Sequence, residues 1–174
     1  MLLYTIGHSN HPLDDFLAML QARHIALLVD VRTVPRSRHN PQFNADTLPA
    51  SLAEHSIAWR HMKELGGLRK PRKDSVNAGW RNDSFRGYAD YMQTREFVAA
   101  LDELMALADA QPTAVMCAEA VPWRCHRSLI ADALTVRGVE VRHIMSRDKW
   151  QAHKMTPFAQ VEGTRITYPF ALEG

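Results

Sequence analysis

The chain has 174 residues, of which 46% are hydrophobic, and its formal net charge is +2 at pH 7. That size and composition suit one globular domain with a real core, so we expect a single domain over residues 1–174. No stretch approaches the apolar length of a membrane span, and the N-terminal apolar run is too short for a secretory signal. We therefore expect a cytoplasmic protein without a membrane partner.

The charge is unevenly distributed along the chain. Residues 32–86 carry a local balance of +6, which leaves −4 for the remaining residues. A basic window of this kind is a candidate contact for a phosphate-rich partner, although a solvated basic loop explains it equally well.

The first half of the chain predicts three strands and two helices. Residues 2–6 form the first strand, and Pro12 suits the first turn of a helix that spans about 9–20. The continuous apolar run at 25–31 predicts a strand that is buried on both faces, as in a parallel sheet. A weaker helix at 47–54 and a short strand at 57–61 precede a long polar connection over 63–84, of the kind that is usually functional or mobile.

The second half continues the alternation of helices and strands. We expect helices at 85–92, 94–107 and 128–137, and strands at 113–117 and 139–145. This order favours an α/β fold, a three-layer domain with a mostly parallel sheet and right-handed crossovers. The tail at 146–174 is expected to pack on or cap the domain edge, where Glu162-Gly163 could close a small C-terminal hairpin.

The stretch 115–127, which joins the end of the strand at 113–117 to the following helix, concentrates reactive side chains. It holds both cysteines of the chain together with an acid, a histidine and two arginines. Because it leaves the carboxyl end of a predicted parallel strand and enters a helix N-terminus, it lies where α/β sheets bind ligands. Helix N-termini also favour anions, so we expect an anion at the helix at 9–20 or at 128–137.

Four residues are candidate catalytic groups. Cys117 could be a thiolate nucleophile whose pKa is lowered by nearby cations, although a cysteine at a strand end is more often a packing residue. Glu119 could act as a general acid or base, or it could pair with an arginine and hold the loop. Asp30 and His126 complete the set, and Asp30 could equally orient its loop or pair with Arg32.

Candidate anion-binding groups follow the other strand ends. A glycine there permits close backbone approach, and arginine forks match the geometry of phosphate. The candidate residues for binding a substrate anion are Thr5, Gly7, His8, Ser9, Arg32, Arg36, Ser37, Arg124 and Arg127.

These groups favour an enzyme that acts on a phosphate-bearing small molecule or nucleic acid at the carboxyl edge of the sheet. The first alternative is a non-catalytic nucleic-acid-binding module that uses Arg38, Lys70, Arg72 and Lys73 on phosphates. Sulfur or redox chemistry at Cys117 and Cys125 is another alternative. A metal site is the last, although the spacing of the cysteines is not that of structural zinc, so no metal ligand is assigned. The sequence identifies neither a cofactor nor a protein partner.

Short motifs spread along the chain resemble one family. They are Thr5-Ile6-Gly7-His8-Ser9, Asp30-Val31-Arg32 with Pro35, Ser37 and Arg38, Leu65-Gly66-Gly67, Tyr88 with Tyr91-Met92, Cys117-Ala118-Glu119 with Pro122, Cys125-His126-Arg127, His143-Ile144, His153 and Thr156. Together they resemble the domain-of-unknown-function family 488. The resemblance implies a compact bacterial or archaeal α/β domain and brings no established reaction. At 146–149 the chain departs from the Ser-Asp-Gly pattern of that family.

A fainter similarity is to rhodanese-type domains. It rests on Asp30-Val31-Arg32 at one strand end and Cys117 at a later one. The loop after Cys117 is longer than in those domains and contains no glycine, so an amide cradle around the sulfur is not implied. Sulfur transfer is therefore only an analogy.

Overall fold

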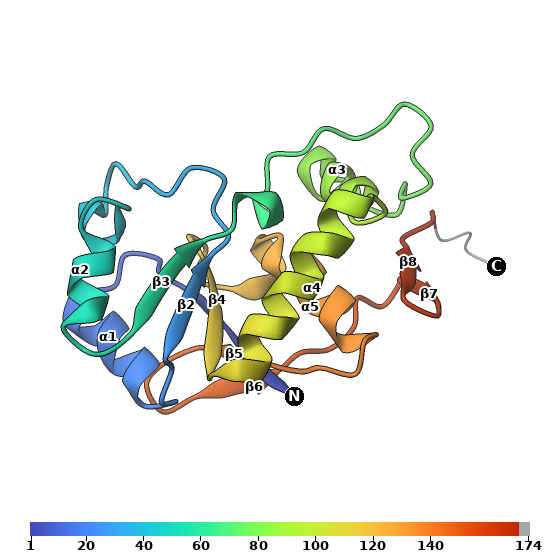
Figure 1. Cartoon of the computed structure of the whole chain (residues 1–174). Coiled ribbons are helices and arrows are strands. Elements are labelled where there is room, and N and C mark those ends of the chain that lie inside the picture. Colours follow the sequence, from blue (N-terminus) through green and yellow to red (C-terminus); the bar gives the residue numbers. More distant parts are fainter. Residues whose placement is uncertain (171–174) are drawn as a thin grey trace.

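One mixed sheet forms the centre of the computed structural model, which describes residues 1–170. Its strand order is β3-β2-β4-β1-β5-β6 (Figure 1). The strands are β1 (Leu2–Gly7), β2 (Leu27–Asp30), β3 (Ala58–His61), β4 (Thr113–Cys117), β5 (Glu140–Ile144) and β6 (Trp150–Ala152). The first five are parallel, and β6 pairs antiparallel with β5. The prediction of an α/β fold with a mostly parallel sheet is confirmed, whereas β6 was not predicted.

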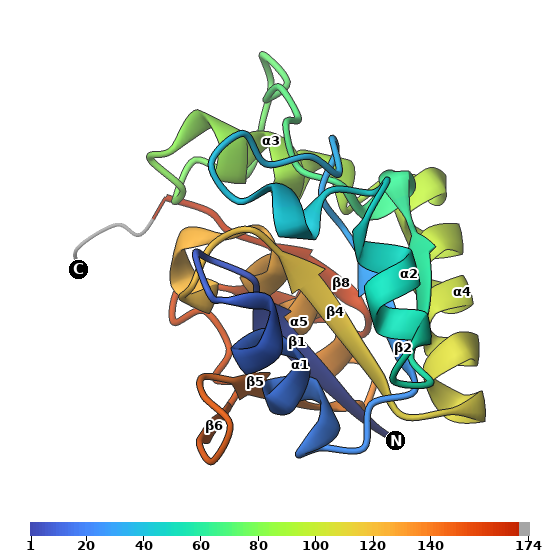
Figure 2. The same ribbon diagram turned by 90° about the vertical axis from the view of Figure 1, so that its left-hand side faces the viewer.

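Helices cover both faces of the sheet. They are α1 (Leu13–Gln21), α2 (Leu48–Ala53), α3 (Asp83–Tyr91), α4 (Arg95–Ala110) and α5 (Arg127–Thr135). The apolar side chains of α1 and α2 pack with Leu28 and Met116 in one core, and those of the other helices pack with Val29 and Val115 in a second. Successive strand residues face opposite sides, which explains this division. Figures 1 and 2 show α1 and α4 on opposite sides of the sheet.

Capping residues fix where two helices begin. The side chain of Asn82 accepts hydrogen bonds from the N–H groups of Ser84 and Phe85, so α3 starts slightly earlier than its apolar pattern predicts. Thr94 caps α4 in the same way through the N–H of Phe97. No helix within residues 1–170 is both long enough and apolar enough to cross a membrane.

The long connection before α3 is tied to that helix. The Asp90 carboxylate accepts hydrogen bonds from the Arg72 N–H at 2.8 Å, from Ser75 Oγ at 2.7 Å and from Asn77 Nδ2 at 2.7 Å. Gly87 permits the close approach, since a Cβ there would lie 2.1 Å from the carbonyl oxygen of Arg69. A few buried contacts therefore hold a segment without regular structure of its own, apart from a short 3₁₀ turn at Lys63–Leu65.

The described part of the tail packs against the domain. The strands β7 (Gln160–Glu162) and β8 (Arg165–Thr167) form the expected small antiparallel hairpin, with Gly163 in the left-handed region at φ +62°. Ile166 and Tyr168 are buried. The remainder of the predicted tail, residues 171–174, lies outside the described residues.

Candidate functional site

A cavity of about 480 Å³ opens at the carboxyl edge of the parallel strands. Segments that follow β2 and β4 line it, together with residues next to the start of α3. Its size is within the range of small-molecule sites, about 300–1,000 Å³. The predicted site residues that line this cavity are Arg32, Arg36, Cys117, Glu119, Arg124 and His126.

Asp30 lies behind the cavity wall and holds Arg32. Its carboxylate accepts hydrogen bonds from Arg32 Nε at 2.9 Å and Arg32 Nη2 at 2.6 Å, and also from the Arg32 backbone N–H at 3.1 Å. Both side chains are buried. The predicted pairing of Asp30 with Arg32 is therefore present. Asp30 itself is not among the residues that line the cavity, so its position is that of a residue that orients Arg32.

The end of β1 supports the loop that follows β4. The N–H groups of His8 and Ser9 donate to the carbonyl oxygens of Cys117 and Ala118, both at 2.9 Å. A Cβ on Gly7 would lie 1.6 Å from the carbonyl oxygen of Glu119. The two N–H groups are thus already bonded within the fold, and Thr5, Gly7, His8 and Ser9 do not line the cavity. Their observed contacts are with the loop that follows β4 and with neighbouring buried side chains.

Arg127 lies under the loop and is completely buried. Its Nη1 donates to Thr5 Oγ1 at 3.0 Å, and its Nη2 donates to the carbonyl oxygens of Glu119 at 3.2 Å and Ala120 at 3.1 Å. No carboxylate within residues 1–170 forms an ion pair with it. A buried charge without a counter-ion is costly. An anion close to this guanidinium would therefore be stabilised.

The two buried thiols lie in the cavity wall, and their acidities differ. Burial opposes ionisation of Cys117, but a hydrogen bond from Cys125 and the charge of Arg127 outweigh it and lower the pKa of Cys117. Burial and the neighbouring sulfur of Cys117 raise the pKa of Cys125. In the thiol form, Cys117 Sγ donates to the carbonyl oxygen of Glu119 at 3.7 Å. Cys117 is thus the sulfur that the fold prepares for ionisation.

His126 and His8 are neutral imidazoles. Burial lowers the pKa of each to about 4. His126 Nε2 lies 2.9 Å from the carbonyl oxygen of Val31 and donates to it, which leaves Nδ1 as an acceptor 3.5 Å from Cys125 Sγ. His8 stacks on Phe43 with ring centroids 4.5 Å apart. The hydrogen bond to Val31 ties His126 to the end of β2. Because its pKa is low, His126 is a weak base.

The remaining predicted residues fall into two groups. Glu119, Arg36 and Arg124 are exposed at the cavity, where they can meet a ligand. The others do not line it. Ser37 Oγ accepts from the Asn40 N–H at 3.1 Å within its own loop. Arg38, Lys70, Arg72 and Lys73 are exposed elsewhere, and Arg72 Nε lies 3.1 Å from Asp74 Oδ1.

A buried network that sequence reasoning missed supports Arg127 from behind. Thr5 Oγ1 is 2.6 Å from His143 Nδ1, His143 Nε2 is 2.9 Å from His153 Nδ1, and His153 Nε2 is 2.7 Å from Asp132 Oδ1. Tyr168 donates to the other Asp132 oxygen at 2.8 Å. The sequence contains a signal for this network. Asp132 is within an apolar helical run, and His143 and His153 belong to motifs to which no role was assigned.

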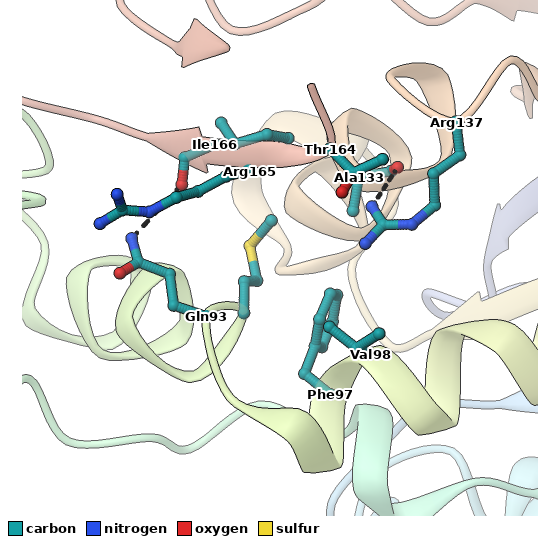
Figure 3. Close-up of a pocket in the computed structure, with 9 residues that line it drawn as sticks. Gln93, Phe97, Val98, Ala133, Arg137, Thr164, Arg165 and Ile166 are labelled. Carbon is teal, nitrogen blue, oxygen red and sulfur yellow. Dashed lines mark hydrogen bonds between the residues drawn. The ribbon is translucent and has the colours of Figure 1, made fainter. Parts of the chain in front are cut away.

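The other cavities do not bring the predicted site residues together. The one between α4, α5 and β8 is lined by Phe97, Arg137 and Arg165, among others, and contains none of them (Figure 3). There Arg137, which follows the end of α5, donates from Nη1 to the carbonyl oxygen of Ala133 at 2.8 Å. Within residues 1–170, no three His, Cys, Asp or Glu side chains are grouped so that they could hold a metal ion.

One family model, described as "Domain of unknown function DUF488", matches residues 12–134. The chain belongs to this family. The DUF488 match includes the cavity residues Arg32, Cys117 and Arg124, whereas β1 and the His143–His153 pair lie outside it. No curated protein and no solved structure matches the chain, so the fainter likeness to rhodanese-type domains gains no support.

Proposed function

We propose that the protein is an enzyme that acts on a phosphate-bearing substrate and uses the thiolate of Cys117 as its nucleophile. The observation that carries this proposal is the buried Arg127 guanidinium, which has no carboxylate partner within residues 1–170. Together with a hydrogen bond from Cys125, its charge lowers the pKa of Cys117. A thiolate at this position would serve as the missing counter-ion. The fold then stabilises the reactive form of the sulfur.

Three guanidinium groups at the cavity suit the phosphate. Arg32 is held by Asp30, and its Nη1 makes only a long contact of 3.4 Å with His8 Nε2, so this nitrogen keeps an N–H group for a ligand oxygen. Arg36 and Arg124 are exposed at the same cavity. Charge-assisted hydrogen bonds from arginine forks bind phosphate well, and a fixed Arg32 would orient it against the sulfur.

The chemistry that follows is group transfer through sulfur. Cys117 Sγ attacks phosphorus, an S–P bond forms, and the bond from phosphorus to the leaving oxygen breaks. A water molecule gives a proton to that oxygen. The Glu119 carboxylate then takes a proton from water, whose oxygen attacks phosphorus, and the S–P bond breaks to release phosphate and the Cys117 thiolate. Both residues line the cavity, as this division of roles requires.

Thiol–disulfide exchange is a second candidate, which the adjacent sulfurs favour. Cys117 thiolate would attack a substrate disulfide and release one substrate thiolate. Cys125 would then displace the other, with two electrons passing to the substrate and a Cys117–Cys125 disulfide remaining. The variant Cys125→Ser separates the candidates, because serine keeps a hydrogen-bond donor for the Cys117 thiolate but supplies no second sulfur, so phosphate chemistry should survive and exchange should be lost.

Titration with inorganic phosphate tests the proposed function. We expect backbone amide shifts at residues 32–36 and 117–126. Arg124→Ala should weaken binding about tenfold, since a hydrogen bond to a charged group contributes about 1.5–3 kcal/mol. The matched control is Lys70→Ala, an exposed basic residue outside the cavity, which should leave the affinity unchanged. Shifts confined to the tail, or equal losses in both variants, would contradict the proposal. Turnover of phosphate esters that Cys117→Ser abolishes is the matching activity test.

A further inference from the structure

A second cavity, of about 340 Å³, lies beside the candidate site. Two chain segments line both cavities: residues 80–85 place Trp80 in the second and Phe85 in the first, and residues 122–128 place Trp123 in the second and Arg124 in the first. The rings of Trp80 and Phe85 are in contact, with centroids 5.1 Å apart. The two cavities are therefore neighbours along these two segments.

His143 and His153 give the second cavity a ring-lined wall. All four of their ring nitrogens are within hydrogen-bond distance of groups of the fold: Thr5 for one, each other across 2.9 Å, and Asp132 for the last. The rings consequently offer a ligand their carbon edges and faces. Burial and the neighbouring His153 lower the pKa of His143 to about 3, so its ring carries no charge. A wall of this kind favours contact with a flat apolar surface.

Aromatic side chains complete the enclosure. Trp80 packs edge-to-face on Phe158 with centroids 4.8 Å apart, which fixes both rings. Trp123 is 59% exposed at the cavity, an unusual position for so large an aromatic side chain. The indole Nε1 of Trp80 is buried and has no hydrogen-bond partner among the described residues. Trp80 therefore faces the cavity with the carbon atoms of its ring.

We propose that the second cavity binds a heteroaromatic ring that belongs to the same substrate as the phosphate, as in a nucleotide. This inference rests on the proposed function, because it assigns the phosphate to the neighbouring arginine-lined cavity. The volume is at the small end of ligand sites, which suits one ring system. Stacking on Trp123 provides affinity for the ring, and Ser128 Oγ and Lys154 offer polar contacts at its edge.

Binding of three probes to the intact chain tests the inference. Inorganic phosphate, adenosine and adenosine 5′-monophosphate are titrated separately, with dissociation constants taken from backbone amide shifts. We expect the nucleotide to bind at least tenfold more tightly than phosphate. Trp123→Ala should weaken nucleotide binding about tenfold and leave phosphate binding unchanged, and Trp123→Phe should restore most of the loss. The control is Trp150→Ala, which removes an exposed tryptophan that lines neither cavity and should change nothing.

The outcomes separate this inference from the proposed function. A nucleotide that binds no more tightly than phosphate, or a Trp123→Ala variant that keeps full nucleotide affinity, would overturn the ring site and leave the phosphate site standing. Adenosine binding that depends on Trp123, without any binding of phosphate, would support the ring site and contradict the proposed function. Failure of all three probes to bind would overturn both.

Discussion

Replacing Gly7 by alanine is expected to disable the loop that carries Cys117. The new Cβ would lie 1.6 Å from the carbonyl oxygen of Glu119 and 2.6 Å from its carbon, and both are backbone atoms. The loop cannot retreat freely, since the N–H groups of His8 and Ser9 bind it on the same side. We expect the free energy of unfolding to fall by about 1–3 kcal/mol, as for overpacked cores. Reaction at Cys117 should slow about 100-fold, because the displaced loop misplaces the sulfur.

Denaturant unfolding and alkylation of Cys117 measure the two effects. Gly138→Ala is the matched control, because this glycine has φ +82° and open space around its Cβ position. Its alanine variant should lose about 1–2 kcal/mol from backbone strain and keep the reactivity of Cys117. If Gly7→Ala retained normal reactivity, the close approach of β1 to the loop would have no functional importance.

Stability should fall steeply as the solution is acidified below about pH 6.5. Burial lowers the pKa of His8 and His126 to about 4 and that of His143 to about 3. The folded protein keeps these rings neutral, while the unfolded chain protonates them near their ordinary pKa of about 6.5. Unfolding therefore takes up between about two and three protons between pH 4.5 and 6, a slope of about 3–4 kcal/mol per pH unit in favour of unfolding. The loss is absent above pH 7.

Urea unfolding at several pH values between 4.5 and 7.5 measures this slope. His8→Gln should reduce it by about one proton. Asn10→Gln, at an exposed residue without a titrating group, serves as the control and should leave the slope unchanged. A free energy of unfolding that stays constant from pH 7 to pH 5 would show that these histidines are not held neutral by the fold.

The sequence predicts most of the fold because its apolar patterns are strong. A continuous run such as 25–31 indicates a strand buried on both faces, and the cysteine-bearing segment follows another such strand. Carboxyl ends of parallel strands meet at one edge of a sheet, so the sequence alone places Arg32, Cys117 and Arg124 near one another, and all three line one cavity. The short edge strand β6 could not be predicted, because its three residues are all exposed and are too few to show a periodic pattern of apolar and polar side chains.

Side-chain direction at the strand ends could not be predicted. Arg127 turns under its loop because Thr5, distant in sequence, offers it a hydrogen-bond acceptor beside the carbonyl oxygens of Glu119 and Ala120. Asp30 is covered because Arg32 folds back onto it. The pattern of apolar and polar residues along a segment contains no information on hydrogen-bond partners that are distant in the sequence. The same holds for Gly7, whose importance comes from packing against a loop far along the chain.

The central claim is that Cys117 is a thiolate in an arginine-lined, phosphate-binding cavity. Its most direct test is the pH dependence of iodoacetamide labelling, resolved by peptide mass spectrometry, with and without phosphate. We predict that Cys117 labels with a midpoint below the ordinary cysteine value of about 8.5 and ahead of Cys125, and that phosphate protects it. Slow labelling of both cysteines with midpoints at or above that value, unaffected by phosphate, would contradict the account.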